Sequence, residues 1–150
     1  MLRDTKKAKD LLLSGNFSCV LCRGGQLYTS QGGGISPMLG FIADKTPLSG
    51  FSAADKVVGR AAALLFIAAG VREVYAVLAS ESARSILSEH KIELFADEIT
   101  AYIKNRRGDG VCPMECAAAN ITDPLLAYQI LSEKLRTLQN STPAPSKQQL

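Results

Sequence analysis

The chain has 150 residues, of which 47% are hydrophobic and 21% are charged, the composition of an ordinary globular protein that can bury a core. Its formal net charge of +3 is too small for the clustered basic surface of a nucleic-acid-binding protein. No apolar run approaches the roughly 20 residues that cross a bilayer, and no signal peptide is recognisable. We therefore expect a cytoplasmic protein without membrane partners, whose four cysteines are reduced thiols, ligands or small core residues before they are disulfides.

The first third of the chain predicts a helix followed by a β-hairpin. Apolar residues at spacings of three and four favour a helix over residues 3–13. Two β-prone runs at residues 17–21 and 26–30 flank Gly24-Gly25 and predict two paired strands. A glycine-rich loop and a short helix follow, at residues 31–37 and 38–43.

The alanine-rich centre of the chain favours one buried helix over residues 53–69. Ser52 is the expected N-cap, and Asp55 falls in the first turn, where a carboxylate suits the helix dipole. On such a helix Lys56 and Arg60 lie one turn apart and share a face, so that a phosphate or carboxylate could bind between them. The alternative is that Asp55 and Arg60 form a pair that only pins the helix.

The second half of the chain predicts strands that alternate with helices. Residues 73–79 form a nearly continuous apolar run, which is typical of a buried parallel strand. The further elements are a helix over residues 81–89 capped by Ser80, a strand at 92–95, a short helix at 97–103, a helix from Cys112-Pro113 and a last helix at 125–138. This order predicts a three-layer α-β-α sandwich with a mixed sheet, in one domain over residues 1–138, and a disordered tail at residues 139–150.

Cys112 and Glu115 carry the strongest chemical signal in the sequence. Pro113 suits the first position of a helix, so Cys112 is the expected N-cap, and Glu115 completes the spacing of a capping box. A thiol at this position faces free backbone amides and the positive end of the helix dipole, which favour the thiolate. The alternative is that Cys112 is a small residue in a tight turn.

The loop before Cys112 predicts an anion pocket. Gly108 and Gly110 allow backbone N–H groups to approach a ligand, and Arg106 or Arg107 supplies positive charge beside Asn105. The alternative is that both arginines are solvated. A flexible lid over the same cleft is expected from Tyr28, Thr29, Ser30, Gly32, Gly33 and Gly34.

Two stretches resemble an uncharacterised bacterial and archaeal family, a domain of unknown function with a Cys-Pro-Met-Glu (CPME) motif. They are residues 50–63 and the Asn-Arg-x-Gly-x-Gly-x-Cys-Pro-Met-Glu run at residues 105–115, and the resemblance covers about residues 17–127. It implies a cytidine-deaminase-like fold. Zinc deaminases carry His-x-Glu and Pro-Cys-x-x-Cys motifs, whose places here are residues 59–62 and 112–116. The first has no His, Cys or Glu, so we expect neither zinc nor a hydrolytic deaminase.

A four-thiolate zinc site is also not favoured. Cys19 and Cys22 are an odd number of positions apart, so on a regular strand their side chains would point to opposite faces of the sheet, and small apolar core residues are the favoured interpretation.

The leading hypothesis is a small-molecule binding domain for a nucleotide or another anion, with its pocket between the two helix starts. Its expected ligand-binding residues are Ser52, Asp55, Lys56, Arg60, Asn105, Arg106, Gly108, Gly110 and Cys112. One alternative is an enzyme with Cys112 as nucleophile or redox centre and Glu115 or Asp55 as proton acceptor. Another is a structural or regulatory module that pairs with a second copy of itself.

Overall fold

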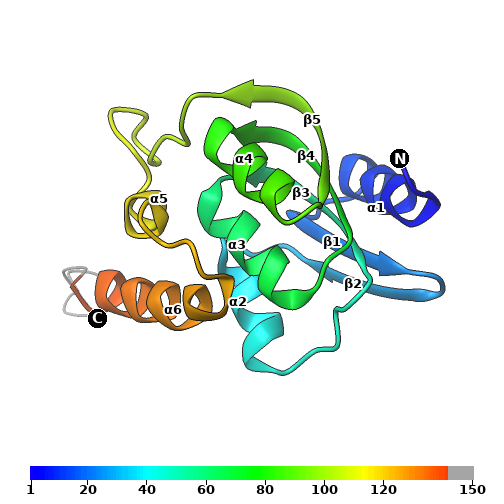
Figure 1. Cartoon of the computed structure of the whole chain (residues 1–150), viewed down its shortest axis with the longest axis horizontal. Helices are drawn as coiled ribbons and strands as arrows, with labels where there is room; N and C mark the ends of the chain where they lie inside the picture. Colours follow the sequence, from blue (N-terminus) through cyan, green and yellow to red (C-terminus); the bar gives the residue numbers. More distant parts are fainter. Residues whose placement is uncertain (142–150) are drawn as a thin grey trace, which may run out of the picture.

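The computed structural model describes residues 1–141, which form one mixed five-stranded sheet with helices on both faces (Figure 1). The strand order is β2-β1-β3-β4-β5. β1 pairs antiparallel with β2 and β3, whereas β3, β4 and β5 run parallel. The elements are α1 (Arg3–Ser14), β1 (Cys19–Arg23), β2 (Gln26–Ser30), α2 (Ser36–Ala43), β3 (Ser52–Val58), α3 (Arg60–Ala69), β4 (Glu73–Ser80), α4 (Glu81–Glu89), β5 (Glu93–Thr100), α5 (Pro113–Ala118) and α6 (Pro124–Ser141).

The helices form two unequal layers, which confirms the predicted three-layer sandwich (Figure 1). α1 alone covers one face, where Ala8 and Leu12 pack with Ala54 and Tyr75. The other face carries α3 and α4, and α5 and α6 pack against α3. This second layer contains the larger core, which includes Leu64, Phe66, Leu87, Ala118 and Leu131. Within residues 1–141 no helix is long and apolar enough to cross a bilayer.

The prediction of one central helix over residues 53–69 is wrong. Ser52–Val58 form β3, and α3 begins only at Arg60. β3 is a central strand with β1 and β4 on either side, and most of its residues are buried. A strand covered on both faces shows no period-two alternation, and its alanines have a strong helix propensity, so the sequence looks helical. Ser52, Asp55 and Lys56 therefore lie on a strand, and Lys56 and Arg60 do not share a helix face.

Two further boundaries differ from the predicted ones. Residues 97–103 do not form a short helix, because β5 continues to Thr100 in parallel register with β4. The predicted tail at residues 139–150 begins too early, because α6 extends to Ser141. Residues 142–150 lie outside the described part of the chain.

The remaining elements agree with the sequence patterns. The hairpin pairs Leu21 with Tyr28, and its turn contains Gly24 at φ 57°. Ser80 caps α4, since its Oγ accepts a hydrogen bond of 3.0 Å from the backbone N–H of Ala83. Local signals thus predict the hairpin and the start of α4 correctly, whereas the errors lie in the central strand β3 and in the second half of β5.

Candidate functional site

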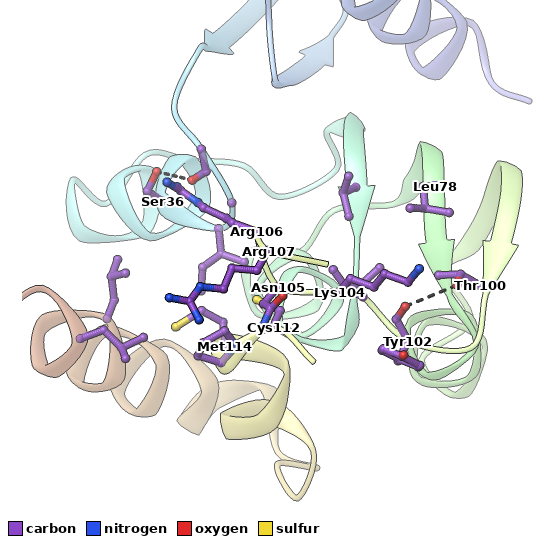
Figure 2. Close-up of a pocket in the computed structure, with 18 of the residues that line it drawn as sticks. Ser36, Leu78, Thr100, Tyr102, Lys104, Asn105, Arg106, Arg107, Cys112 and Met114 are labelled. Atoms are coloured by element: carbon purple, nitrogen blue, oxygen red, sulfur yellow. Dashed lines mark hydrogen bonds between the residues drawn. The ribbon is translucent and has the colours of Figure 1, made fainter. Parts of the chain in front are cut away.

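A cavity of about 900 Å³ lies at the carboxyl ends of the three parallel strands (Figure 2). Its floor includes Val57 near the end of β3, Leu78 on β4 and Thr100 at the end of β5. Open α/β sheets bind ligands at this end of their strands. The volume also falls in the range of small-molecule sites, roughly 300–1,000 Å³.

Two loops and two helices form the walls of this cavity. Residues 33–36 line one side, and residues 102–107, which follow β5, line another. Cys112 and Met114 reach it from the start of α5, and Leu135 and Leu138 from α6. Segments that are far apart in the sequence therefore meet around one hollow.

Cationic side chains predominate among the charged residues of the lining. Lys104, Arg106 and Arg107 line the cavity together with a single carboxylate, that of Glu98. Within residues 1–141 none of these four side chains forms an ion pair, since the described pairs are Arg84 with Glu81 and Arg136 with Glu133. The cavity thus has an excess of positive charge that the described part of the chain does not neutralise.

The loop that presents these cations is held by its own hydrogen bonds. The Asn105 side-chain amide donates to Asp109 Oδ1 at 3.0 Å, and its oxygen accepts from the Asp109 N–H at 3.2 Å. The Asn105 N–H donates to the Gly110 carbonyl at 2.8 Å, and Gly108 adopts φ 77°, which favours glycine. Asn105 lines the cavity and Gly108 and Gly110 do not, so a ligand contact from these glycines stays a prediction.

Cys112 lies at the predicted helix start and faces the cavity. It is the N-cap residue of α5, Pro113 is the first helical residue, and the Cys112 side chain is half-buried in the cavity wall. Its side chain makes no capping hydrogen bond. The helix start is confirmed, whereas the nucleophilic or redox role of Cys112 stays a prediction.

Glu115 does not close the predicted capping box, because its carboxylate caps a different helix. Oε1 accepts the N–H of Arg60 at 2.7 Å and Oε2 accepts the N–H of Ala61 at 2.9 Å, both at the N-terminus of α3. Gly59 allows this approach, since a Cβ there would collide with the carboxylate. A carboxylate at this position satisfies two amides and complements the helix dipole. Its role as proton acceptor for Cys112 stays a prediction.

Arg60 makes the reciprocal contacts with the other end of α5. Its Nε donates to the Ala118 carbonyl at 3.1 Å, and its Nη2 donates to the Ile121 carbonyl at 2.6 Å. Nη1 donates to Ser82 Oγ at 3.2 Å. We call this exchange between Gly59, Arg60, Glu115, Ala118 and Ile121 the α3–α5 clamp. Arg60 does not line the cavity, and its guanidinium is already occupied by protein partners.

The other residues expected near the helix start lie in three different environments, and none of them lines the cavity. Ser52 is buried under α1, where its Oγ accepts a hydrogen bond of 2.8 Å from Thr5. Lys56 is exposed on β3. Asp55 is buried beside Cys19, and burial raises the pKa of its carboxyl to about 8. The ligand-binding roles of Ser52, Asp55 and Lys56 stay predictions that the cavity does not support.

Tyr102 and Lys104 also line the cavity and were not predicted from the sequence. Both follow the last parallel strand, and residues after such strands gather at the binding edge of an α/β sheet. This rule could be applied only if the end of β5 had been predicted correctly. Because residues 97–103 read as a helix, the loop behind them could not be placed at the sheet edge.

The cysteines occupy separate environments. Cys19 and Cys22 are buried on opposite faces of β1, as their spacing predicts, and belong to different core clusters. Cys116 is exposed. Among residues 1–141 no group of three or more His, Cys, Asp or Glu side chains is arranged to hold a metal ion.

Comparison with known proteins identifies the family. Residues 7–135 match the family described as Domain of unknown function (DUF1893). The chain belongs to the DUF1893 family. Its structure is similar to the crystal structure of a DUF1893 family protein from Thermotoga maritima, with a TM-score of 0.81 over 89% of this chain and 92% of that chain. At 21% identity this likeness shows a shared fold. No curated protein matches the chain.

Membership of DUF1893 confirms the expected relation to a domain of unknown function. The match includes the whole cavity wall up to Leu135, and also the α3–α5 clamp. The clamp and all of the named cavity wall except Leu138 therefore lie inside the family domain.

Proposed function

We propose that this DUF1893 protein binds a small anionic molecule in the cavity at the carboxyl ends of β3, β4 and β5. The observation that carries the proposal is the trio Lys104, Arg106 and Arg107, which line one hollow without an ion pair to any residue among 1–141. Like charges in a concave site repel each other and attract counter-ions. A bound anion relieves that repulsion, and this relief makes a favourable contribution to the free energy of binding.

The α3–α5 clamp supports this assignment of the cations. Arg60 is engaged with two carbonyls and Ser82, and the free amides at the start of α3 are already occupied by Glu115. The cations that remain for anion binding therefore lie in the loop after β5. The proposed anion site is therefore not between Lys56 and Arg60 but at Arg106, which was also expected from the sequence.

We also propose that the fold is related to the cytidine deaminases, as the CPME resemblance implies. The mixed sheet between two helical layers is compatible with that relation. Zinc hydrolysis is not part of the proposal, because residues 59–62 are Gly-Arg-Ala-Ala and offer no metal ligand or proton shuttle. The proposed activity is binding.

A melting-temperature screen tests the binding function. The protein is heated with inorganic phosphate, nucleotides, nucleosides, sugar phosphates and polycarboxylates, each at several concentrations. A ligand at 100 times its Kd adds about 2.7 kcal/mol of stability, which corresponds to roughly 5–10 °C for a domain of this size. Arg106→Ala with Arg107→Ala should abolish the shift.

The matched control is Arg72→Ala, which removes an exposed arginine outside the cavity. This variant should keep the full shift. A screen in which no anion raises the melting temperature contradicts the proposal, and so does a shift that survives the double substitution.

A second candidate is an enzyme that uses Cys112, and the observation in its favour is that Cys112 lines the same cavity as the cations. Alkylation by iodoacetamide between pH 5 and 10, in a Cys116→Ser background, measures the ionisation of this thiol. Rapid alkylation below pH 7 supports the enzyme, and a midpoint near about 8.5 contradicts it. The homo-oligomeric module stays a prediction, which sedimentation of the purified protein tests.

A further inference from the structure

The cavity has two chemically different ends. Figure 2 shows Arg106 extending toward Ser36 at one end, and Leu78, Thr100 and Tyr102 at the other. Arg107 lies on the Arg106 side, near Met114. A ligand that fills the cavity therefore meets guanidinium groups at one end. At the other end it meets an apolar and aromatic surface, beside which lie the Lys104 side chain (Figure 2) and Glu98, the register partner of Leu78.

The cationic end matches a dianion better than a monoanion. Arg106 and Arg107 together carry two positive charges, and a guanidinium donates two parallel hydrogen bonds to phosphate or carboxylate oxygens. A phosphate monoester carries a charge of about −1.5 to −2 at pH 7, whereas a carboxylate carries a single charge. Arg106 also lies close to Gly33, since a Cβ built on Gly33 would be 3.5 Å from Nη2 of Arg106.

The apolar end leaves side chains open to water inside a concave surface. Tyr102 is 46% exposed and Val57 is 42% exposed, and both line the cavity with Leu78. A flat apolar group placed here would cover the tyrosine ring in an offset-stacked or edge-to-face arrangement. Burial of this apolar surface makes the free energy of binding more favourable, and inorganic phosphate has no apolar group that could cover it.

The size of the cavity gives a third, independent reason for an organic part. Its volume of about 900 Å³ is far larger than the room that a free phosphate needs, given that a water molecule takes about 30 Å³ of the liquid. Phosphate alone would leave most of the space and the Tyr102 end uncovered.

We infer that the ligand is a phosphate monoester with a flat apolar group, bound with its phosphate at Arg106 and Arg107 and its ring against Tyr102. This inference rests on the proposed function, because it names the chemical class of the anion that the same cavity would bind.

Isothermal titration calorimetry with four probes tests this inference. The probes are 1-naphthyl phosphate, 1-naphthoate, 1-naphthol and inorganic phosphate, so that ring, charge and phosphate are varied separately. We expect 1-naphthyl phosphate to bind at least tenfold more tightly than each of the other three. Arg106→Gln with Arg107→Gln should weaken its binding at least tenfold, and Arg72→Gln should leave it unchanged.

Tyr102 tests the apolar end on its own. Tyr102→Ala should weaken binding of 1-naphthyl phosphate about three- to tenfold and leave inorganic phosphate unaffected, whereas Tyr102→Phe should retain the affinity. Circular dichroism of each free variant checks that the fold is intact. Since Tyr102, Arg106 and Arg107 are all exposed, their substitution should not disturb the core.

The outcomes separate the inference from the proposed function. Equal affinity for 1-naphthoate overturns the preference for phosphate, and equal affinity for inorganic phosphate overturns the apolar group, while the anion site stands in both cases. Binding of another anion from the melting screen, with none of these probes bound, also overturns only the inference. If no anion of either set binds, the proposed function fails.

Discussion

The α3–α5 clamp and the wall of the cavity both contain arginines, and the difference lies in what those arginines contact. In the clamp, the Arg60 side chain donates to two carbonyls and a hydroxyl, and Glu115 accepts two amides in return. In the cavity wall, Arg106 and Arg107 form no ion pair with any described residue. The first group stabilises the fold, and the second is available for a ligand.

The two regions are also connected along the chain. α5 carries Glu115, and the loop with Arg106 and Arg107 leads directly into it. The clamp fixes α5 against α3, and Cys112 N–H donates to the Ile103 carbonyl at 2.9 Å at the base of the loop. We therefore expect clamp variants to change stability and cavity variants to change binding.

Gly59→Ala should have the largest effect on stability. The new Cβ would collide with the Glu115 carboxylate, so that the variant suffers overpacking and also loses the two amide contacts. Overpacking costs about 1–3 kcal/mol and each of the two hydrogen bonds to a charged group about 1.5–3 kcal/mol, so we expect a loss of about 4–9 kcal/mol. Urea denaturation measures it.

Gly40→Ala is the matched control, because Gly40 lies inside α2 with no atom within 4 Å of its would-be Cβ. Alanine is favoured over glycine in a helix, so this variant should gain about 0.5–1 kcal/mol. Similar losses in both variants would contradict the steric role of Glu115.

Glu115→Ala should destabilise the protein by about 3–6 kcal/mol, since it removes the acceptor of the Arg60 and Ala61 amides. In a Gly59→Ala background the same change should cost much less, because the colliding carboxylate is gone. A double-mutant cycle in urea detects this coupling. Additive losses would show that the clamp does not act as one unit.

Asp55 should make stability fall as the pH rises. Burial raises the pKa of its carboxyl from 3.8 to about 8 in the folded protein, so between these values the folded state keeps a proton that the unfolded state has released. Its contribution is therefore fully present below about pH 4 and is lost progressively up to about pH 8. The free energy of unfolding falls by at most about 1.4 kcal/mol per pH unit in this range.

Asp55→Asn should flatten this dependence, because an amide does not titrate and can still accept the Val57 N–H. Urea denaturation at pH 5 and pH 8, for the wild type and the variant, measures the change in slope. Equal slopes in the two proteins would contradict a protonated Asp55 in the folded state.

Arg106→Ala with Arg107→Ala should have the smallest effect on the stability of the free protein, within about 0.5 kcal/mol, because both side chains are exposed and form no ion pair among residues 1–141. Thermal denaturation without ligand measures it. A loss of more than 1 kcal/mol would place these arginines with the clamp, as structural residues.

The sequence predicted the layered fold and most of its elements, because their signals are local. Ser80 precedes α4 as a cap, Pro113 starts α5, and Gly24 turns the hairpin. β3 could not be predicted in this way, because a strand buried on both faces has no alternation. Helical layers pack on both faces of β3 and favour small side chains such as alanine there. This packing is a property of the tertiary structure, which no local pattern shows.

The candidate site was predicted only in part, for a related reason. Arg106, Asn105 and Cys112 were expected from the motif and do line the cavity. Arg60 and Glu115 belong to equally conspicuous motifs, yet all but one of their partners are backbone groups more than 50 residues away, and the remaining one is the Ser82 hydroxyl. No local pattern distinguishes a charge that a distant helix end will satisfy from one that stays available.

The most direct test of the cavity assignment is a titration of ¹⁵N-labelled protein with 1-naphthyl phosphate, followed by amide chemical shifts. We predict saturable shifts at Gly33, Gly34 and residues 102–107, and small ones at Lys56. Shifts that gather around residues 52–56, or an absence of saturable shifts for this and every other anion, would contradict the account.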